Sequence, residues 1–257
     1  MAIARSPSTR SQPGTTSGAF LARHRMVIAV ELVLLAAFIA LTVIVTGHRA
    51  PLPGDVGLTL WWQHLVRPHH LLTTVFDEAR AINFPSGVAV TLIVLGALFA
   101  LLRRWLDLLV AGAVLVVNEV VFFLINEFVR RPRPSGYGIV VEQDITKIYG
   151  VYSFPSGHVM YTLAFLGIVL FLAFQVRRPG PWLTPALWVV RIILLALIVL
   201  ELPAAVLAGE HWPSDGLAGL LWGGFWLLVG LQVYPWAVRR WPRLLGAGER
   251  AAGLAVA

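Results

Sequence analysis

The 257-residue chain contains no cysteine and few charged residues. The absence of cysteine excludes disulfide frameworks, thiolate metal sites and cysteine nucleophiles. Charged residues make up 13% of the chain and hydrophobic residues 58%, a balance that is too apolar for an ordinary soluble domain of this size. The composition therefore indicates an integral membrane protein.

The net charge of +7 does not indicate a nucleic-acid partner. The arginines fall in short clusters between apolar runs, whereas nucleic-acid-binding proteins carry them along one basic surface. Membrane topology explains the clusters, because Lys and Arg accumulate in cytoplasmic loops. We therefore expect contact with the lipid bilayer and no binding of nucleic acid.

Six apolar runs are long enough to cross a bilayer as helices, since each residue adds about 1.5 Å toward a hydrocarbon layer of roughly 30 Å. Continuous apolar runs favour helices over barrel strands, in which apolar and polar residues alternate. The predicted fold is an all-α, six-helix transmembrane bundle. The predicted spans are 26–46, 85–102, 106–128, 158–174, 187–209 and 216–234.

The remaining segments predict one membrane domain, residues 21–245, between two tails. Residues 1–20 are rich in Ser, Thr, Gly and Pro and are expected to be disordered, and residues 246–257 form a similar flexible tail. Residues 57–83 mix aromatic and basic side chains and are expected to lie in the membrane interface. The histidines of this segment fit the interface better than a metal site, and we expect no bound metal; they are His64, His69 and His70.

The distribution of Lys and Arg predicts the orientation in the membrane. With the amino terminus inside, the inner segments hold twelve of these residues and the outer segments seven, which places both termini in the cytoplasm. An arginine-rich chain without cysteine is typical of proteins in a bacterial plasma membrane, and we expect this location. Four of the seven outer cations lie in one loop, between spans three and four, and they call for a functional explanation.

Three polar segments stand at predicted outer ends of spans and are expected to form one pocket: 126–134, 153–158 and 209–215. Arginine guanidinium groups match phosphate oxygens and stay charged. Ser156 and Gly157 come where a helix begins, so unpaired backbone N–H groups there favour an anion. The outer pocket is therefore a candidate phosphate site.

His211 and Asp215 are four residues apart, which places them on one helical face. The carboxylate can then hold one imidazole nitrogen as N–H and leave the lone pair of the other free to attack phosphorus. His158 can protonate the departing alkoxide. Together these side chains suit metal-free phosphoryl transfer through a phosphohistidine, without a cofactor.

At residues 85–235 the chain resembles the type 2 phosphatidic acid phosphatase superfamily, membrane lipid phosphate phosphatases related to vanadium haloperoxidases. Its pattern is Lys, six residues and Arg-Pro; then Pro-Ser-Gly-His; then Ser-Arg, five residues, His, three residues and Asp. The resemblance implies that His211 is the nucleophile, that Asp215 orients it and that His158 is the general acid. The residues implied to bind the phosphate are Arg133, Ser156 and the amide of Gly157.

The chain departs from that pattern at two cations. Asn126 stands at the lysine position, and Ala204 and Ala205 replace Ser-Arg. Each lost charge-assisted hydrogen bond is worth about 1.5 to 3 kcal/mol, so losing two without replacement lowers the rate by roughly two to four decades. We expect Asn126 to keep its place in the phosphate site and Arg131, Arg130 or Lys147 to supply charge from the loop.

The predicted function is removal of phosphate from a lipid phosphate or polyprenyl diphosphate at the outer membrane face. Two alternatives remain open: a phosphotransferase with an acceptor other than water, and a non-catalytic or weakly active lipid-phosphate-binding protein on the same scaffold. Carboxylates inside predicted spans form either a proton or substrate path or buried, protonated groups; they are Glu31, Glu119 and Glu201.

Overall fold

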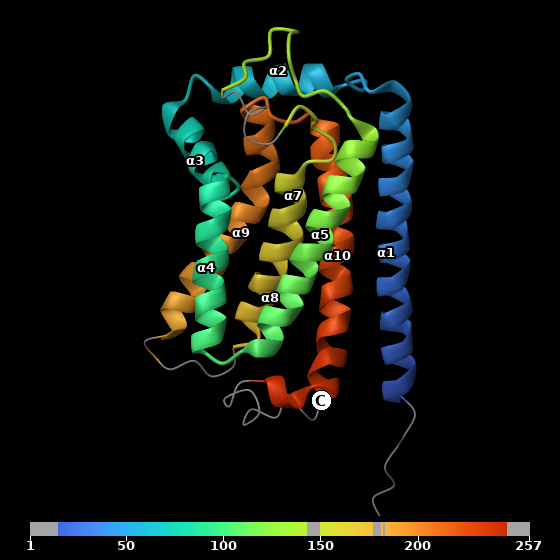
Figure 1. Ribbon diagram of the computed structural model, residues 1–257, viewed down its shortest axis with the longest axis vertical. Helices are drawn as coiled ribbons and strands as arrows, with labels where there is room; N and C mark the ends of the chain where they lie inside the picture. Colours follow the sequence, from blue (N-terminus) through green and yellow to red (C-terminus); the bar gives the residue numbers. More distant parts are fainter. Residues whose placement is uncertain (1–14, 143–149, 177–180, 182, 246–257) are drawn as a thin grey trace, which may run out of the picture.

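The computed structural model describes residues 15–142, 150–176, 181 and 183–245, and over these residues the chain is a helical bundle without a strand (Figure 1). The long helices run roughly side by side, and α7 continues into α8 through the π-helical turn Thr162–Leu166. The helices are α1 Thr15–His48, α2 Asp55–Val66, α3 His70–Ala81, α4 Pro85–Leu101, α5 Trp105–Val129, α7 Gly157–Tyr161, α8 Gly167–Phe174, α9 Leu183–Leu207 and α10 Pro213–Arg240, followed by the 3-10 turn Pro242–Leu244.

The structure confirms the all-α membrane bundle. Within the described part of the chain, five helical stretches are long and apolar enough to cross a membrane, and a sixth is added if α3 and α4 count as one broken span. These two helices are bent by 61° at the break. Pro85 opens α4, a position where its missing N–H is tolerated and its fixed φ suits a new helix. The predicted second span is therefore α4, which follows a bend.

The predicted interfacial segment consists of α2 and α3, and α2 lies across one end of the bundle (Figure 1). Side chains of α2 attach it to the end of α9: the indole of Trp62 donates to the carbonyl of Pro203 at 2.8 Å, and the amide of Gln63 donates to the carbonyl of Leu207 at 2.8 Å. The opposite side of α2 is exposed at Trp61. This amphipathic arrangement fits a helix in the membrane interface.

The described ends of the chain lie at the end of the bundle opposite α2 (Figure 1). Helix α1 begins at Thr15, so the expected disordered tail of residues 1–20 is too long by the helical residues 15–20. The rest of that tail, the expected carboxyl-terminal tail 246–257 and Lys147 lie outside the described residues.

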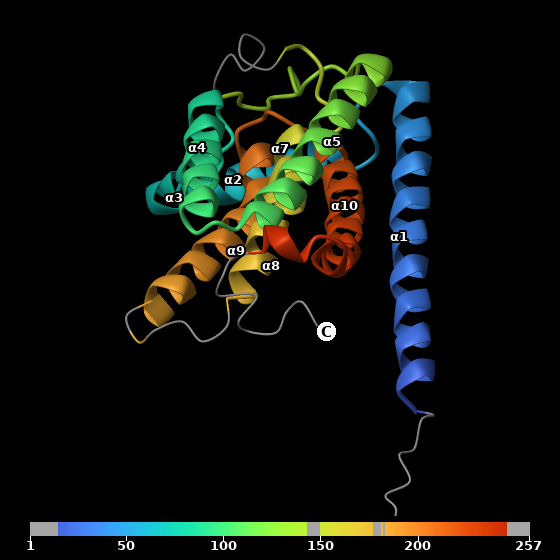
Figure 2. The same cartoon turned by 60° about the horizontal axis from the view of Figure 1, so that its bottom comes forward.

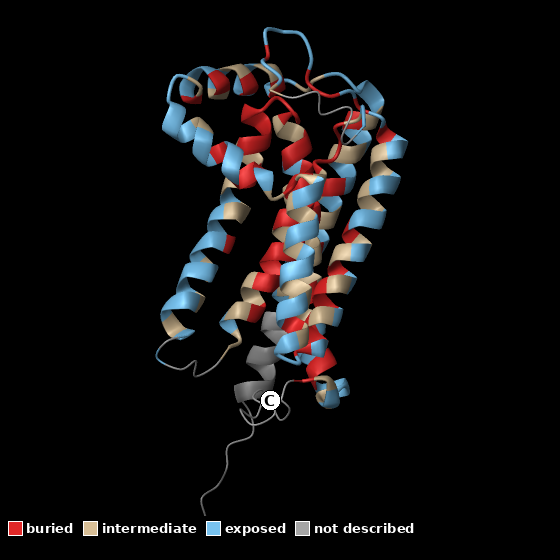
Figure 3. Cartoon of the chain, turned by 60° about the vertical axis from the view of Figure 1, so that its left-hand side comes forward, coloured by how far each residue is buried: buried red, intermediate tan, exposed pale blue. Residues whose placement is uncertain are grey.

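Burial is concentrated in the α7–α8 span and at the end of the bundle covered by α2 (Figure 3). Helix α1 stands at the edge, next to α10 (Figure 2), where the rings of Phe38 and Trp222 are 4.9 Å apart. Glycines let α10 approach α7 closely: a Cβ at Gly219 would lie 2.8 Å from the side chain of Val159. Helix α7 is therefore buried and packs closely against α10, which fixes the position of the first residues of α7.

Candidate active site

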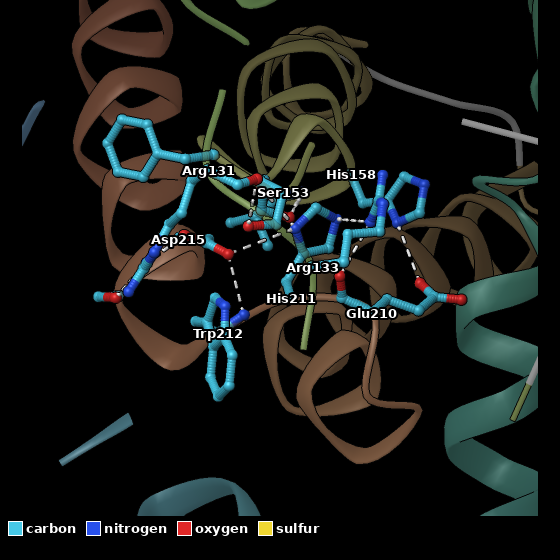
Figure 4. A network of polar contacts seen from close by, with 12 residues as sticks. Arg131, Arg133, Ser153, His158, Glu210, His211, Trp212 and Asp215 are labelled. Atoms are coloured by element: carbon cyan, nitrogen blue, oxygen red, sulfur yellow. Dashed lines mark hydrogen bonds and ion pairs between the residues drawn. The ribbon is translucent and has the colours of Figure 1, made fainter. Parts of the chain in front are cut away.

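The three polar segments singled out in the sequence meet beneath α2, where two histidines face each other (Figure 4). The rings of His158 and His211 are 5.5 Å apart between centroids and nearly perpendicular, at 81°. His158 belongs to the first turn of α7, and His211 lies in the turn between α9 and α10. Gly209, with φ of +70°, makes this turn possible, since only glycine adopts that conformation without strain.

The imidazole of His211 is held by a backbone carbonyl. Its Nδ1 lies 2.8 Å from the oxygen of Ser153, and because a carbonyl can only accept, Nδ1 carries the proton. The lone pair is then on Nε2, which lies 3.5 Å from Nη1 of Arg133. Burial lowers the pKa of His211 well below its ordinary value, and the charges of Arg133 and His158 lower it further. The lowered pKa favours the neutral ring, with the lone pair of Nε2 beside the guanidinium of Arg133.

Asp215 does not make the expected hydrogen bond to His211. Its Oδ2 is 3.9 Å from Nδ1 of the imidazole and accepts instead from the backbone N–H of Trp212 at 2.9 Å, which caps α10. Its Oδ1 accepts from Arg131 at 2.5 Å. Trp212 and Arg131 therefore hold the carboxylate, which lies near the imidazole of His211 without a hydrogen bond to it.

Arg131 was expected to contact the phosphate, but the structure places its side chain elsewhere. Its side chain is fully buried, and it donates to Asp215 at 2.5 Å, to Asp55 at 2.7 Å and to the hydroxyl of Ser214 at 2.8 Å. Asp55 also accepts from the backbone N–H of Ser214 at 2.9 Å. The guanidinium thus joins the start of α2 to the start of α10. Its buried position leaves phosphate binding to other groups.

Arg133 is the guanidinium that lines the site cavity with both histidines. Its Nε donates to the carbonyl of Gly150 at 3.0 Å and its Nη1 to the carbonyl of Glu210 at 2.9 Å. These two bonds fix the planar group beside Nε2 of His211. The geometry suits contact with an anion bound at that nitrogen.

The remaining expected phosphate contacts lie around the start of α7. The hydroxyl of Ser156 caps this helix by accepting from the N–H of Val159 at 3.4 Å, and Gly157 lines the cavity. Asn126 donates to the carbonyl of Phe154 at 3.0 Å, and so it anchors the loop that carries His158. The structure therefore puts a loop anchor where the family pattern has a lysine.

Neither the position of the lost family arginine nor the expected substitute Arg130 supplies charge to the cavity. Ala205, at the position of that arginine, is fully buried in α9. Arg130 is exposed at the end of α5 and pairs with Glu127 at 3.6 Å. The loop cations that the structure describes therefore leave Arg133 as the one placed beside the histidines.

A chain of charged groups, most of them buried, reaches His158 from the side of α3, and the sequence did not predict that these groups meet there. Nδ1 of His158 lies 3.4 Å from Oε2 of Glu210 and 3.8 Å from Oε1 of Glu201. The other oxygen of Glu210 pairs with Arg80, which also donates to Glu142 at 3.1 Å. The sequence marked Glu201 as a carboxylate inside a predicted span, and its other signals were a carboxylate next to His211 and an arginine in the interfacial segment.

Glu210 is ionised in this setting. Burial by itself raises the pKa of Glu210, but the hydrogen bond and charge of His158 and the charge of Arg80 outweigh burial and lower it below the ordinary value. A carboxylate therefore faces His158.

The histidines open onto a cavity of about 230 Å³ between α4, α5 and α7. Its wall is polar at the histidines and mostly apolar further into the membrane-spanning part. Leu92 of α4 and Glu119 of α5 line this cavity and are exposed. The lining residues are Asn83, Val88, Leu92, Leu115, Glu119, Phe122, Arg133, Gly157, His158, Tyr161 and His211.

Comparisons with known proteins identify the family and the fold of the chain. The family model of the PAP2 superfamily matches residues 107–239, which include both histidines. The fold is similar to the crystal structure of a transmembrane PAP2-type phosphatidylglycerolphosphate phosphatase from Bacillus subtilis, with a TM-score of 0.62 and 22% sequence identity, over 79% of this chain and 94% of the other. A search of the curated proteins found no match.

Proposed function

The chain belongs to the PAP2 superfamily, and we propose that it is a metal-independent phosphatase of membrane lipid phosphates or polyprenyl diphosphates. The single observation that carries the proposal is the pair of facing imidazoles, 5.5 Å apart, with Nε2 of His211 beside Arg133. A neutral imidazole next to a guanidinium combines a nucleophile with a group that stabilises the phosphate under attack.

The reaction proceeds in two steps. In the first, the lone pair of His211 Nε2 forms a bond to phosphorus while the bond from phosphorus to the lipid oxygen breaks, and His158 gives its proton to that oxygen. In the second, His158 takes a proton from a water molecule, whose oxygen attacks the phosphohistidine and releases phosphate and free His211. Each proton transfer by a positioned histidine is worth roughly 10² to 10⁴ in rate.

The supporting groups keep His211 ready for attack. The carbonyl of Ser153 holds Nδ1 as N–H, and this N–H stabilises the phosphohistidine as charge develops on the ring. Asp215, 3.9 Å away, adds a negative charge on the same side. Arg133 and the amide of Gly157 bind the phosphate oxygens.

The cavity suits a substrate whose tail stays in the membrane. Its apolar wall is formed by α4 and α5, so a hydrocarbon chain enters between these helices while the phosphate meets the histidines. Since the described chain ends lie at the opposite end of the bundle and the inner segments carry more Lys and Arg, we place both termini in the cytoplasm and the site at the outer face of a bacterial plasma membrane.

A non-catalytic lipid-phosphate-binding protein is the second candidate, and the loss of two family cations favours it. Asn126 anchors a loop and Ala205 is packed in α9, so neither supplies charge. The facing histidines favour the enzyme, because a binding protein needs no proton donor at the leaving oxygen. A phosphotransferase would share the first step and use another acceptor in the second.

One assay separates these candidates. The purified protein in detergent with a chelator is offered phosphatidic acid, phosphatidylglycerolphosphate and undecaprenyl diphosphate, and released phosphate is compared with that of His211→Ala. The matched control is His64→Ala, which removes an exposed histidine of α2. The enzyme proposal expects release by the protein and by the control alone. Equal release by His211→Ala would support the binding protein, and loss of activity with chelator would contradict metal independence.

A further inference from the structure

The proton donor of the proposed reaction has to be oriented, and Glu210 is in position to orient it. Nδ1 of His158 lies 3.4 Å from Oε2 of Glu210, and the ring is only 10% exposed. Glu201 is a second carboxylate on the same nitrogen, but its distance is longer, at 3.8 Å. If Nδ1 is held by a carboxylate, the opposite ring nitrogen points away from it, toward the cavity that His158 lines.

Glu210 is itself fixed from several sides. One carboxylate oxygen pairs with Arg80, whose side chain is 4% exposed. The guanidinium of Arg80 also holds Glu142 at 3.1 Å, and Glu142 pairs with Arg67 at 2.9 Å. Alternating charges thus run from His158 to the partly exposed Arg67.

The backbone of Glu210 ties the same residue to the phosphate side of the cavity. Its carbonyl accepts from Nη1 of Arg133 at 2.9 Å, and the next residue along the chain is His211. One residue therefore contacts the proton donor through its side chain and the phosphate-binding guanidinium through its backbone. A buried ion pair such as that of Arg80 with Glu210 does not in itself stabilise the fold. Its effect on the site is that it fixes the carboxylate of Glu210 next to His158.

We propose that Glu210 is the positioning residue of His158: it accepts from Nδ1 and so directs the Nε2 proton at the lipid oxygen that leaves. During bond cleavage this proton passes from Nε2 to the departing oxygen, giving the lipid alcohol, and His158 is left neutral, with its Nδ1–H still donating to Glu210. The inference rests on the proposed function. It adds a residue that acts through another residue and touches no substrate.

The dependence on the leaving group tests this role. A lipid alkoxide needs a proton to depart, whereas p-nitrophenolate does not, so a defect in proton donation by His158 slows the first step for the lipid and spares the first step for p-nitrophenyl phosphate. The second step is common to both substrates, so the rate of leaving-group release is measured within the first turnover. For Glu210→Gln we expect this rate to fall about 100-fold for phosphatidic acid, in line with the loss of general acid catalysis, and less than about threefold for p-nitrophenyl phosphate. His158→Ala should show the same selective loss.

Glu142→Gln is the matched control, because it removes another carboxylate partner of Arg80 without touching His158; the first-turnover rate should stay within about threefold for both substrates. Glu210→Asp keeps the charge and should recover part of the rate lost for phosphatidic acid, and it replaces the Gln variant if that variant fails to fold. An equal loss for both substrates, or no loss for either, overturns the inference. A native protein that releases phosphate from neither substrate overturns the proposed function instead, and the inference with it.

Discussion

Replacing Arg133 by methionine removes the cation beside the nucleophile and should change two separate properties of the enzyme. The guanidinium lies 3.5 Å from Nε2 of His211, where phosphorus has to bind. One charge-assisted hydrogen bond is worth about 1.5 to 3 kcal/mol. At roughly 1.36 kcal/mol per decade, the loss of a single contact in the transition state lowers kcat/KM about 10-fold to 150-fold.

The same change alters the pH dependence. Burial, Arg133 and His158 lower the pKa of His211, in that order, and the nucleophile is active only when neutral. Removing the positive charge of Arg133 raises the pKa of His211 back toward its ordinary value. The acid limb of the profile of kcat/KM against pH should therefore move to higher pH, while burial and His158 keep it below the limb of an exposed histidine.

The assay is release of phosphate from phosphatidic acid in detergent over a range of pH, with thermal unfolding to establish that the variant is folded. Arg130→Met is the matched control, since Arg130 is exposed and pairs with Glu127 at 3.6 Å. The kcat/KM of this variant should stay within about threefold of the native value, and its acid limb should not shift. A folded Arg133→Met protein with unchanged kcat/KM, or with an acid limb that stays in place or moves to lower pH, would refute the role given to this residue.

Three further changes test other parts of the structure. Arg131→Met leaves Asp55 buried without its cation and should lower the free energy of unfolding by about 3 to 5 kcal/mol, measured by thermal unfolding in detergent. Gly157→Ala places a Cβ 2.9 Å from the ring of Phe122 and should lower kcat/KM, and adding Phe122→Leu should restore it; failure of the second change to help would contradict this crowding. Glu119→Leu removes a polar group from the cavity wall and should lower kcat/KM by about tenfold more for lysophosphatidic acid, which carries a hydroxyl close to its phosphate, than for undecaprenyl phosphate. Equal effects on both lipids would show that Glu119 does not contact the substrate.

The sequence was sufficient for the bundle and for the meeting of the two histidines. Hydropathy and length predict spans because lipid requires every backbone polar group to be bonded within the helix. The predicted spans also place the segments that carry His158 and His211 on the same side of the membrane, since each segment stands at the end of a span on that side. The bend between α3 and α4 was missed, because α3 alone is too short and too polar to read as part of a span.

The partners of the site residues could not be read from the sequence. The acceptor of His211 is the backbone carbonyl of Ser153, and every residue has such a carbonyl. Asp215 is drawn to Arg131 by the position of the loop and by the cap of α10. The pairing of Arg80 with Glu210 joins residues 130 positions apart, and only the packing of α3 against α9 brings them together.

Attack by His211 on phosphorus is the central step of the proposed mechanism, and chemical trapping tests this attack directly. The protein is mixed with ³²P-labelled phosphatidic acid, quenched in alkali within the first turnover, and the labelled peptide is identified by mass spectrometry, with His158→Ala to slow breakdown of the intermediate. We predict phosphate on His211 in both proteins and none in His211→Ala. Turnover without any labelled peptide, or with phosphate on a residue other than His211, would contradict the mechanism.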